Sequence, residues 1–181
     1  TTGIARFQVF RRVAHLLERQ FAREVPVDVL KQRGLRAIDD GRYGAAARLL
    51  ERAIALGAVD RETSCGAGVA CEALREPLRA AHHFMAAGRQ AESSGDLESA
   101  LRDYLRVRAL VPTLIEARER LFALRNAATA SPAAAGYDAF REGRELAELL
   151  FELRRNEELA LVLSGLADLT HDDTAKMEAV A

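Results

Sequence analysis

The sequence predicts an all-α protein of antiparallel helix hairpins, with further helices at its N- and C-terminal ends. Apolar residues recur at helical spacing along most of the 181 residues, and short polar breaks containing glycine separate the helical stretches. Hydrophobic residues make up 49% of the chain and charged residues 29%, and there are only four prolines. This composition suits a soluble helical domain with a real core. Because tryptophan is absent and alanine is abundant, small side chains must supply many of the helix contacts.

Residues 1–26 are predicted to form an N-terminal amphipathic helix with basic residues on the face opposite its apolar stripe. The segment carries five arginines against two glutamates, a net charge of +3, and Val25-Pro26 ends it because a residue before proline avoids helical angles. Such a helix could lie on a membrane surface or serve as a targeting presequence. Glu18, Glu24 and the scarcity of serine favour the alternative, a helix packed on the one that follows. The apolar stripe comprises Ile4, Phe7, Phe10, Val13, Ala14, Leu17 and Phe21.

The stretch from Leu30 to Leu56 is predicted to form the first hairpin. Apolar and small residues recur at helical spacing up to Ile38, the polar link Asp39-Asp40-Gly41-Arg42 interrupts them, and the pattern resumes at Tyr43. Two short helices of this kind cannot bury their apolar faces alone. We therefore expect them to pack against each other and against a neighbouring element.

Residues 59–128 continue the helical pattern. A helix is expected to start at Val59-Asp60 and to stop before Pro77, which is well placed in the first turn of the next helix because proline lacks an N–H. That next helix covers residues 77–93 and ends at Ser93-Ser94-Gly95-Asp96. A further helix leads to Pro112, and a last one begins at Leu114.

At two places the sequence resembles the tetratricopeptide (TPR) repeat family, whose repeats of about 34 residues pair two antiparallel helices. The first copy matches at Leu30, Gly34, Ala37, Gly41-Arg42-Tyr43, Ala46, Leu50 and Ala53. The second matches at Phe84, Ala87-Gly88, Ala91, Gly95-Asp96-Leu97, Ala100, Tyr104 and Pro112. The resemblance implies a TPR-like α-solenoid over residues 27–128.

The spacing of the two copies predicts a shared helix. Their first marks, Leu30 and Phe84, are 54 positions apart, which is one repeat plus about one helix. Residues 77–93 would therefore close a middle repeat that begins near Arg61 and open the next one. Phe84 is then expected to be buried between these two repeats. Small residues permit burial of two helix faces, namely Ala80, Ala81, Ala86, Ala87 and Ala91.

Residues 133–181 are predicted to form a C-terminal helical extension, behind a linker near Thr129-Ala130-Ser131-Pro132. Two amphipathic helices are expected over residues 137–169 with a break at Asn156, and Thr170 to Asp173 is expected to cap a short final helix from Thr174 to Val180. Residues 137–181 contain eleven acids against five basic residues, a net charge of −6. The expected inward positions are Phe140, Leu146, Leu149, Leu150, Leu153, Leu159, Leu161, Val162 and Leu166.

No set of residues in the sequence indicates catalysis, a cofactor or a metal site. Gly66-x-Gly68 lies within a helical pattern without the third glycine of a phosphate loop. His82 and His83 point about 100° apart on a helix, so one packed and one exposed histidine is the expected state. Cys65 and Cys71 fall on roughly opposite helix sides, and free thiols fit a reducing compartment. The net charge of −1 argues against a nucleic-acid binder, and no apolar run reaches the roughly 20 residues of a membrane span.

The TPR resemblance implies a groove in which the first helix of each repeat contacts a partner peptide. Some family members clamp a terminal carboxylate with lysine and asparagine; Lys31 fits the lysine, but Leu35 stands in place of the asparagine. Apolar residues between charges suit an apolar ridge on a partner better. The implied groove residues are Lys31, Gln32, Leu35, Asp39, Cys65, Val69, Glu72, Met85, Arg89 and Glu92.

The sequence therefore predicts a non-enzymatic, cytoplasmic scaffold or adaptor that binds a protein or peptide partner. Two alternatives remain. Three repeats behind an N-terminal helix also resemble cytoplasmic chaperones of type III secretion. A self-assembling structural subunit is the other alternative, with the basic N-terminal helix of one copy docked on the acidic C-terminal helices of the next.

Overall fold

The computed structural model describes residues 25–126 and 137–180, with side chains placed as far as His171. Eight helices and no strand occur in this part of the chain, which confirms the predicted all-α class. The helices are α2 (Val27–Asp39), α3 (Tyr43–Ala55), α4 (Arg61–Ala73), α5 (Pro77–Ser93), α6 (Leu97–Leu110), α7 (Ile115–Ala123), α9 (Ala139–Glu152) and α10 (Asn156–Val180).

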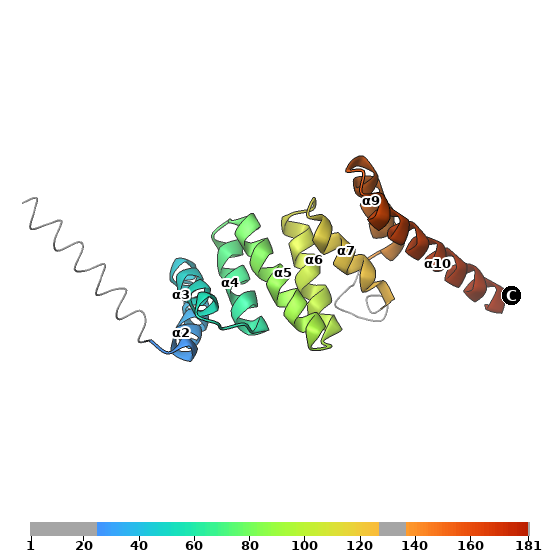
Figure 1. Ribbon diagram of the computed structural model, residues 1–181. Coiled ribbons are helices and arrows are strands. Elements are labelled where there is room, and N and C mark those ends of the chain that lie inside the picture. Colours follow the sequence, from blue (N-terminus) through green and yellow to red (C-terminus); the bar gives the residue numbers. More distant parts are fainter. Residues whose placement is uncertain (1–24, 127–136, 181) are drawn as a thin grey trace, which may run out of the picture.

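Consecutive helices are neighbours and follow one another in a row (Figure 1). Each helix from α2 to α6 packs on the next one, and the row continues through α7 to α9 and α10. This is the arrangement of helix hairpins that the sequence predicted. The predicted N-terminal helix of residues 1–26 and the linker at Thr129–Pro132 lie outside the described residues, except for the final Val25-Pro26.

The first predicted hairpin is confirmed as α2 and α3. A Cβ at Gly34 would lie only 2.6 Å from Leu50 Cγ, so the absence of a side chain on α2 lets the two helices approach closely. Gly41 turns the chain between them with a φ of +70°, a conformation that favours glycine. Leu30, Ala37 and Leu50 are buried along the contact.

The packing expected of residues 77–93 is confirmed, because α5 packs on both α4 and α6. Phe84 is fully buried at the centre of this contact. Its ring lies beside Gly68 of α4, where a Cβ would be 2.8 Å from Cε1, and the Arg106 guanidinium of α6 stands 4.5 Å from the ring centroid. The small residues that were expected to permit burial of two helix faces are also placed accordingly. Ala80, Ala81, Ala87 and Ala91 are buried, and Ala86 is half-buried.

The C-terminal helices form a separate hydrophobic cluster. α9 and α10 pack on each other, and α7 contributes Phe122 to the same cluster. Arg154, with a φ of +56°, turns the chain between them, and α10 begins at Asn156, where the break was predicted. The buried members are Phe122, Leu146, Ala147, Leu150, Val162 and Leu166.

Two predictions for this region are wrong. α10 runs without interruption to Val180, so no separate helix starts at Thr174. The Thr170 hydroxyl donates to the carbonyl of Ala167, three residues earlier (2.8 Å), a bond made within a continuous helix rather than at a new N-terminus. Phe140, Leu153 and Leu161 are exposed rather than inward. In the described residues α9 and α10 pack mainly on each other and on the short α7, and these three side chains lie outside those contacts.

Candidate functional site

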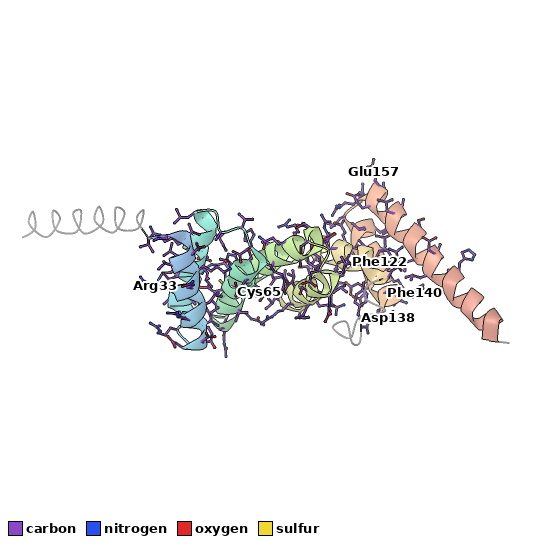
Figure 2. All side chains as sticks on the ribbon, turned by 90° about the horizontal axis from the view of Figure 1, so that it is seen from below. Arg33, Cys65, Phe122, Asp138, Phe140 and Glu157 are labelled. Carbon is purple, nitrogen blue, oxygen red and sulfur yellow. The ribbon has the colours of Figure 1, made fainter. Side chains whose placement is uncertain are left out.

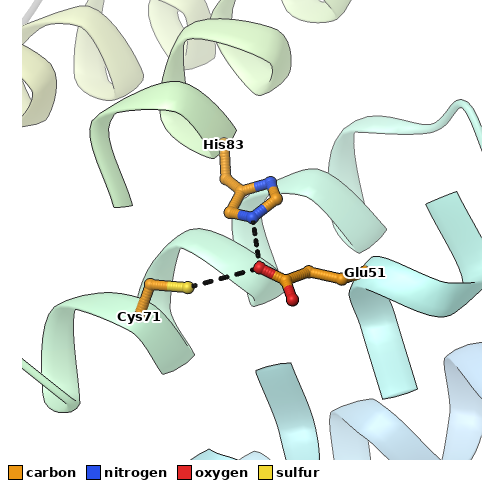
Figure 3. A group of neighbouring side chains, drawn as sticks. All are labelled: Glu51, Cys71 and His83. Atoms are coloured by element: carbon orange, nitrogen blue, oxygen red, sulfur yellow. Dashed lines mark hydrogen bonds and ion pairs between the residues drawn. The ribbon is translucent and has the colours of Figure 1, made fainter. Parts of the chain in front are cut away.

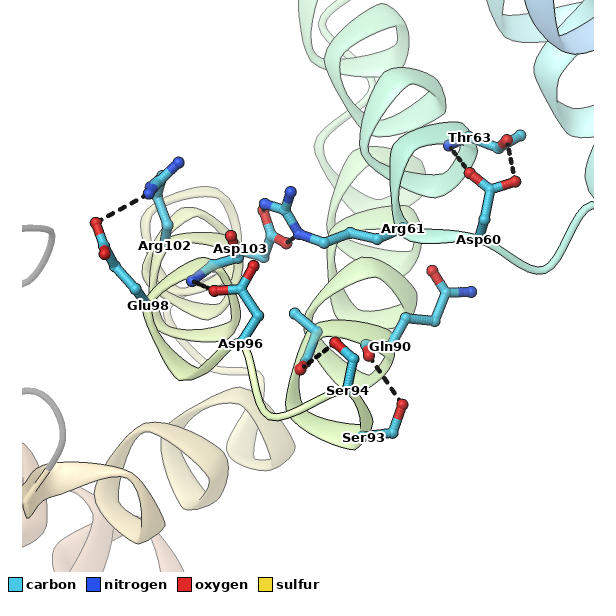
Figure 4. Close-up of polar contacts among 12 residues, drawn as sticks. Asp60, Arg61, Thr63, Gln90, Ser93, Ser94, Asp96, Glu98, Arg102 and Asp103 are labelled. Carbon is cyan, nitrogen blue, oxygen red and sulfur yellow. Dashed lines mark hydrogen bonds and ion pairs between the residues drawn. The ribbon is translucent and has the colours of Figure 1, made fainter.

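Ion pairs join the N-terminal end of α4 to α2 on one side and to α6 on the other. Lys31 Nζ of α2 lies 3.0 Å from Asp60 Oδ1 and 2.7 Å from Glu62 Oε2. Arg61 makes a two-pronged pair with Asp103 of α6, with Nε 2.9 Å from Oδ2 and Nη2 3.2 Å from Oδ1 (Figure 4). α4 is thereby tied to the helices two places before and two places after it in the row.

The contact between α4 and α6 extends to the other end of α4. Glu72 Oε2 lies 2.8 Å from Arg106 Nη2, and the side chains of Glu72 and Arg106 are 36% and 41% exposed. The surface that these helices share is called the α2–α4–α6 face. Its members are Lys31, Leu35, Arg61, Cys65, Val69, Glu72, Asp103 and Arg106.

The middle of the α2–α4–α6 face is apolar. Leu35, Cys65 and Val69 are all half-buried, so each keeps part of its side chain accessible. Leu35 Cδ2 would lie 3.0 Å from a Cβ at Gly66, which places this leucine of α2 directly against α4. Chemically, such a strip can cover apolar side chains of another molecule, while the flanking charges restrict how that molecule lies.

Burial is the main cause of two pKa shifts on this face. It raises the pKa of Asp103, although the bond from Arg61 acts in the opposite direction. Burial likewise raises the pKa of the Cys65 thiol, and the nearby Asp103 carboxylate adds to the effect. The thiol is therefore protonated at neutral pH and behaves as a small apolar group rather than as a nucleophile.

The structure places Lys31, the proposed carboxylate-binding lysine, in an existing ion-pair network. Bonds to Glu62 and Asp60 raise the pKa of Lys31 above its ordinary value. An incoming carboxylate would have to compete with both of these groups. The other two α2 positions implied by the resemblance, Gln32 and Asp39, are exposed.

The three implied groove residues of α5 lie elsewhere, beside α6 and α7. Arg89 Nη1 is 2.8 Å from Glu116 Oε1 of α7, and Glu92 Oε2 accepts a hydrogen bond from the Tyr104 hydroxyl of α6 (2.8 Å). Met85 is only 3% exposed and lines a pocket of about 210 Å³ near the α6–α7 connection. The structure thus brings Lys31 and Leu35 of α2 beside α4, and places Met85, Arg89 and Glu92 in a second location.

Sequence reasoning missed the α6 side of the face. Arg61 and Asp103 are 42 positions apart, a separation at which no local pattern connects two residues. One signal was present nonetheless. Asp103 falls in the stripe of Ala100, Tyr104 and Val107, and an acid among buried apolar residues requires a partner.

The histidine pair is arranged as predicted, with His82 exposed and His83 buried. His83 also lies beside Glu51 and Cys71, two residues from other helices that the sequence spacing did not associate with it. In the described part of the chain, no helix is long and apolar enough to cross a membrane.

Comparisons with known proteins give little beyond this geometry. No protein-family model matches the chain, and no curated protein matches it. Among solved structures, "MamA MSR-1 C2" is 18% identical, with a TM-score of 0.32 over 81% of this chain and 98% of that one. "MamA AMB-1 P212121" is also 18% identical, with a TM-score of 0.26 over 86% of this chain and 97% of that one. Similarities this low carry no argument about function.

Proposed function

We propose that this chain is a non-enzymatic scaffold that holds a peptide or helix of another protein on the α2–α4–α6 face. The observation that carries the proposal is the half-buried strip of Leu35, Cys65 and Val69, bordered by charged side chains at both ends. A partner with an apolar ridge flanked by charges matches this strip. In this proposal residues 27–128 form the binding part and residues 133–181 an extension.

The charges of the face support binding by apolar contact rather than by charge attraction alone. Lys31, Arg61 and Arg106 each already pair with a carboxylate of this chain. A partner's charges therefore gain little by direct pairing but can exclude wrong orientations. The protonated Cys65 thiol also supports a binding role over nucleophilic catalysis.

Val69→Asp tests this function. A displayed library of random peptides is selected on the intact chain, and the selected peptides are measured again on two variants. Because a charge in the centre of the apolar strip would be desolvated by the partner, Val69→Asp should weaken binding by at least about tenfold. The matched control is Leu78→Asp, which places the same charge on α5 at a position that is 73% exposed and outside the α2–α4–α6 face. The proposal fails if both variants bind equally well, or if only Leu78→Asp loses binding.

The same protein samples also test a second candidate, self-assembly through α9 and α10. It is favoured by large apolar side chains on these two helices and the turn between them that are more than half exposed, namely Phe151, Leu153, Leu161 and Leu163. Light scattering at low and high salt distinguishes the two ways to assemble. An assembly made by the basic residues 1–26 on the acidic C-terminal helices should dissociate in high salt, whereas an apolar interface should persist. A constant monomer mass excludes this candidate.

A further inference from the structure

Three helices bring a thiol, an imidazole and a carboxylate to one place. Glu51 comes from α3, Cys71 from α4 and His83 from α5 (Figure 3). His83 Nε2 lies 3.0 Å from Glu51 Oε1, and Cys71 Sγ lies 3.9 Å from the same oxygen. One ligand atom from each residue lies within 4.8 Å of the other two.

The packing of the helix row fixes these positions. Cys71 is fully buried in the main core cluster, and His83 is 9% exposed. α4 packs between α3 and α5, so the three side chains converge on one point across two helix contacts. The Glu51 side chain is 31% exposed, which leaves one open side through which an ion can enter.

Two of the three distances between ligand atoms are close to those that tetrahedral coordination of a zinc ion requires. With zinc bonds of 2.0–2.3 Å to nitrogen, oxygen and sulfur, neighbouring ligand atoms are roughly 3.3–3.7 Å apart. The two distances at Glu51, 3.0 Å and 3.9 Å, each lie within a few tenths of an ångström of that range. The third pair, Cys71 and His83, has ligand atoms within 4.8 Å of each other, so rotations that close this gap by up to about 1 Å would place all three atoms around one ion.

Arg79 competes with an ion for the same carboxylate. Its Nη2 lies 2.7 Å from Glu51 Oε1, and its other terminal nitrogen pairs with Glu76. Burial opposes ionisation of Glu51, but bonds from His83 and Arg79 outweigh it and hold the pKa of this carboxyl below its ordinary value. The Arg79 side chain is 49% exposed, so it can move aside and keep Glu76 as its partner.

We propose that Glu51, Cys71 and His83 form a binding site for a divalent metal ion of the zinc type. Thiolate, imidazole and carboxylate together are ligands that zinc accepts, and three protein ligands leave a fourth position open to water or another ligand. The ion would join α3, α4 and α5. This site is independent of the α2–α4–α6 face, so either proposal can fail without the other.

The test is a metal titration of the intact chain after treatment with a chelator. Zinc affinity is measured by competition with a chromophoric chelator, and cobalt is added to a second sample as a spectroscopic probe. We expect one equivalent of either ion and a thiolate-to-cobalt charge-transfer band. Absence of that band from the folded, unmodified protein overturns the proposal without any variant.

Variants then identify the ligands. Cys71→Ser should abolish the cobalt–thiolate band. Glu51→Gln and His83→Gln should each weaken zinc binding by more than about 100-fold, because the loss of a group that only orients a ligand weakens binding by at most about that factor. The chain offers matched controls in its other thiol and the adjacent histidine, so Cys65→Ser and His82→Gln should bind as the unmodified protein does. Arg79→Gln should bind more tightly. Weaker binding by Arg79→Gln, or loss of the band in Cys65→Ser, would contradict the assignment.

Discussion

Aromatic rings occupy the space opposite glycine at several helix contacts. Phe84 lies against Gly68, and Tyr104 of α6 lies against Gly88 of α5. Both rings are fully buried, and the Tyr104 hydroxyl reaches Glu92. At each contact the glycine is required because a ring fills the space that a Cβ would take.

Gly88→Ala should therefore destabilise the protein even though alanine favours helices. A Cβ at this position would lie 2.4 Å from Tyr104 Cε1, and the buried ring has little room to move. Overpacking destabilises by about 1–3 kcal/mol, and the higher helix propensity of alanine offsets about 1 kcal/mol of this loss. The free energy of unfolding, measured by urea denaturation, should fall.

Gly44→Ala is the matched control. The nearest atom to a Cβ there is Arg48 Nη1 at 4.0 Å, so the substitution should stabilise by about 0.4–1 kcal/mol. The two alanines should thus change stability with opposite signs. A gain of stability in both variants would mean that the α5–α6 contact is looser than the structure has it.

At the scale of single helices, local sequence signals were sufficient to place most boundaries. Polar breaks with glycine, the proline at residue 77 and the periodicity of apolar residues act over a few positions, and they predicted the limits of α2 to α6 closely. The end of α10 was missed because Thr170 to Asp173 has the composition of a cap, although the helix continues through it. The Arg61–Asp103 pair and the Glu51, Cys71 and His83 cluster were missed because their members come from different helices, which no local period relates.

Asp60 shows how a single helix end combines two roles. Its side chain caps α4 by accepting from the backbone N–H (2.9 Å) and the hydroxyl (2.8 Å) of Thr63 (Figure 4). It also accepts from Lys31, and these bonds lower its pKa although burial acts against them. Asp60→Ala should therefore cost about 0.5–2 kcal/mol at neutral pH, as loss of an N-cap does.

Because the pKa of Asp60 is lower in the folded state, its charge stabilises the protein above the unfolded-state pKa. That contribution is lost as the pH falls through the folded-state pKa. Asp60→Asn keeps an oxygen for the cap but cannot titrate, so its stability should fall less than that of the unmodified protein between about pH 5 and pH 2. Urea denaturation at each pH measures this. If the free energy of unfolding of Asp60→Asn falls with decreasing pH as much as that of the unmodified protein, other carboxyls cause the loss of stability.

At the scale of the whole molecule, α7 connects two hydrophobic clusters. Ala117 and Leu121 belong to the large cluster of the helix row, whereas Phe122, labelled in Figure 2, belongs to the C-terminal cluster. The connection is reinforced by polar groups. Glu142 of α9 is almost fully buried. It accepts hydrogen bonds from Arg118 of α7 (2.9 Å) and from Arg108 of α6.

Arg118 is thus the residue whose loss should detach the C-terminal helices from the row. Besides Glu142, it donates to the carbonyl of Pro112 (2.7 Å) and to Glu145 (2.9 Å). Removing one partner of a buried charge leaves the other without compensation, at a cost of about 3–5 kcal/mol; this is an upper value for Arg118→Met, because Arg108 still contacts Glu142. Hydrogen exchange should show faster exchange in α9, with α2 to α5 unchanged.

Two further variants decide whether the buried pair causes this effect. Arg144→Ala removes an exposed arginine of α9 whose ion pair with Glu148 spans 3.8 Å, and it should change stability by no more than about 0.5 kcal/mol. The double variant Arg118→Met with Glu142→Leu removes both buried charges, so it should recover much of the stability that Arg118→Met loses. If Arg118→Met is as harmless as Arg144→Ala, the apolar contact of Phe122 with α9 and α10 is sufficient to hold the two clusters together. If the double variant is less stable than Arg118→Met, the loss comes from packing around α7 rather than from an uncompensated carboxylate.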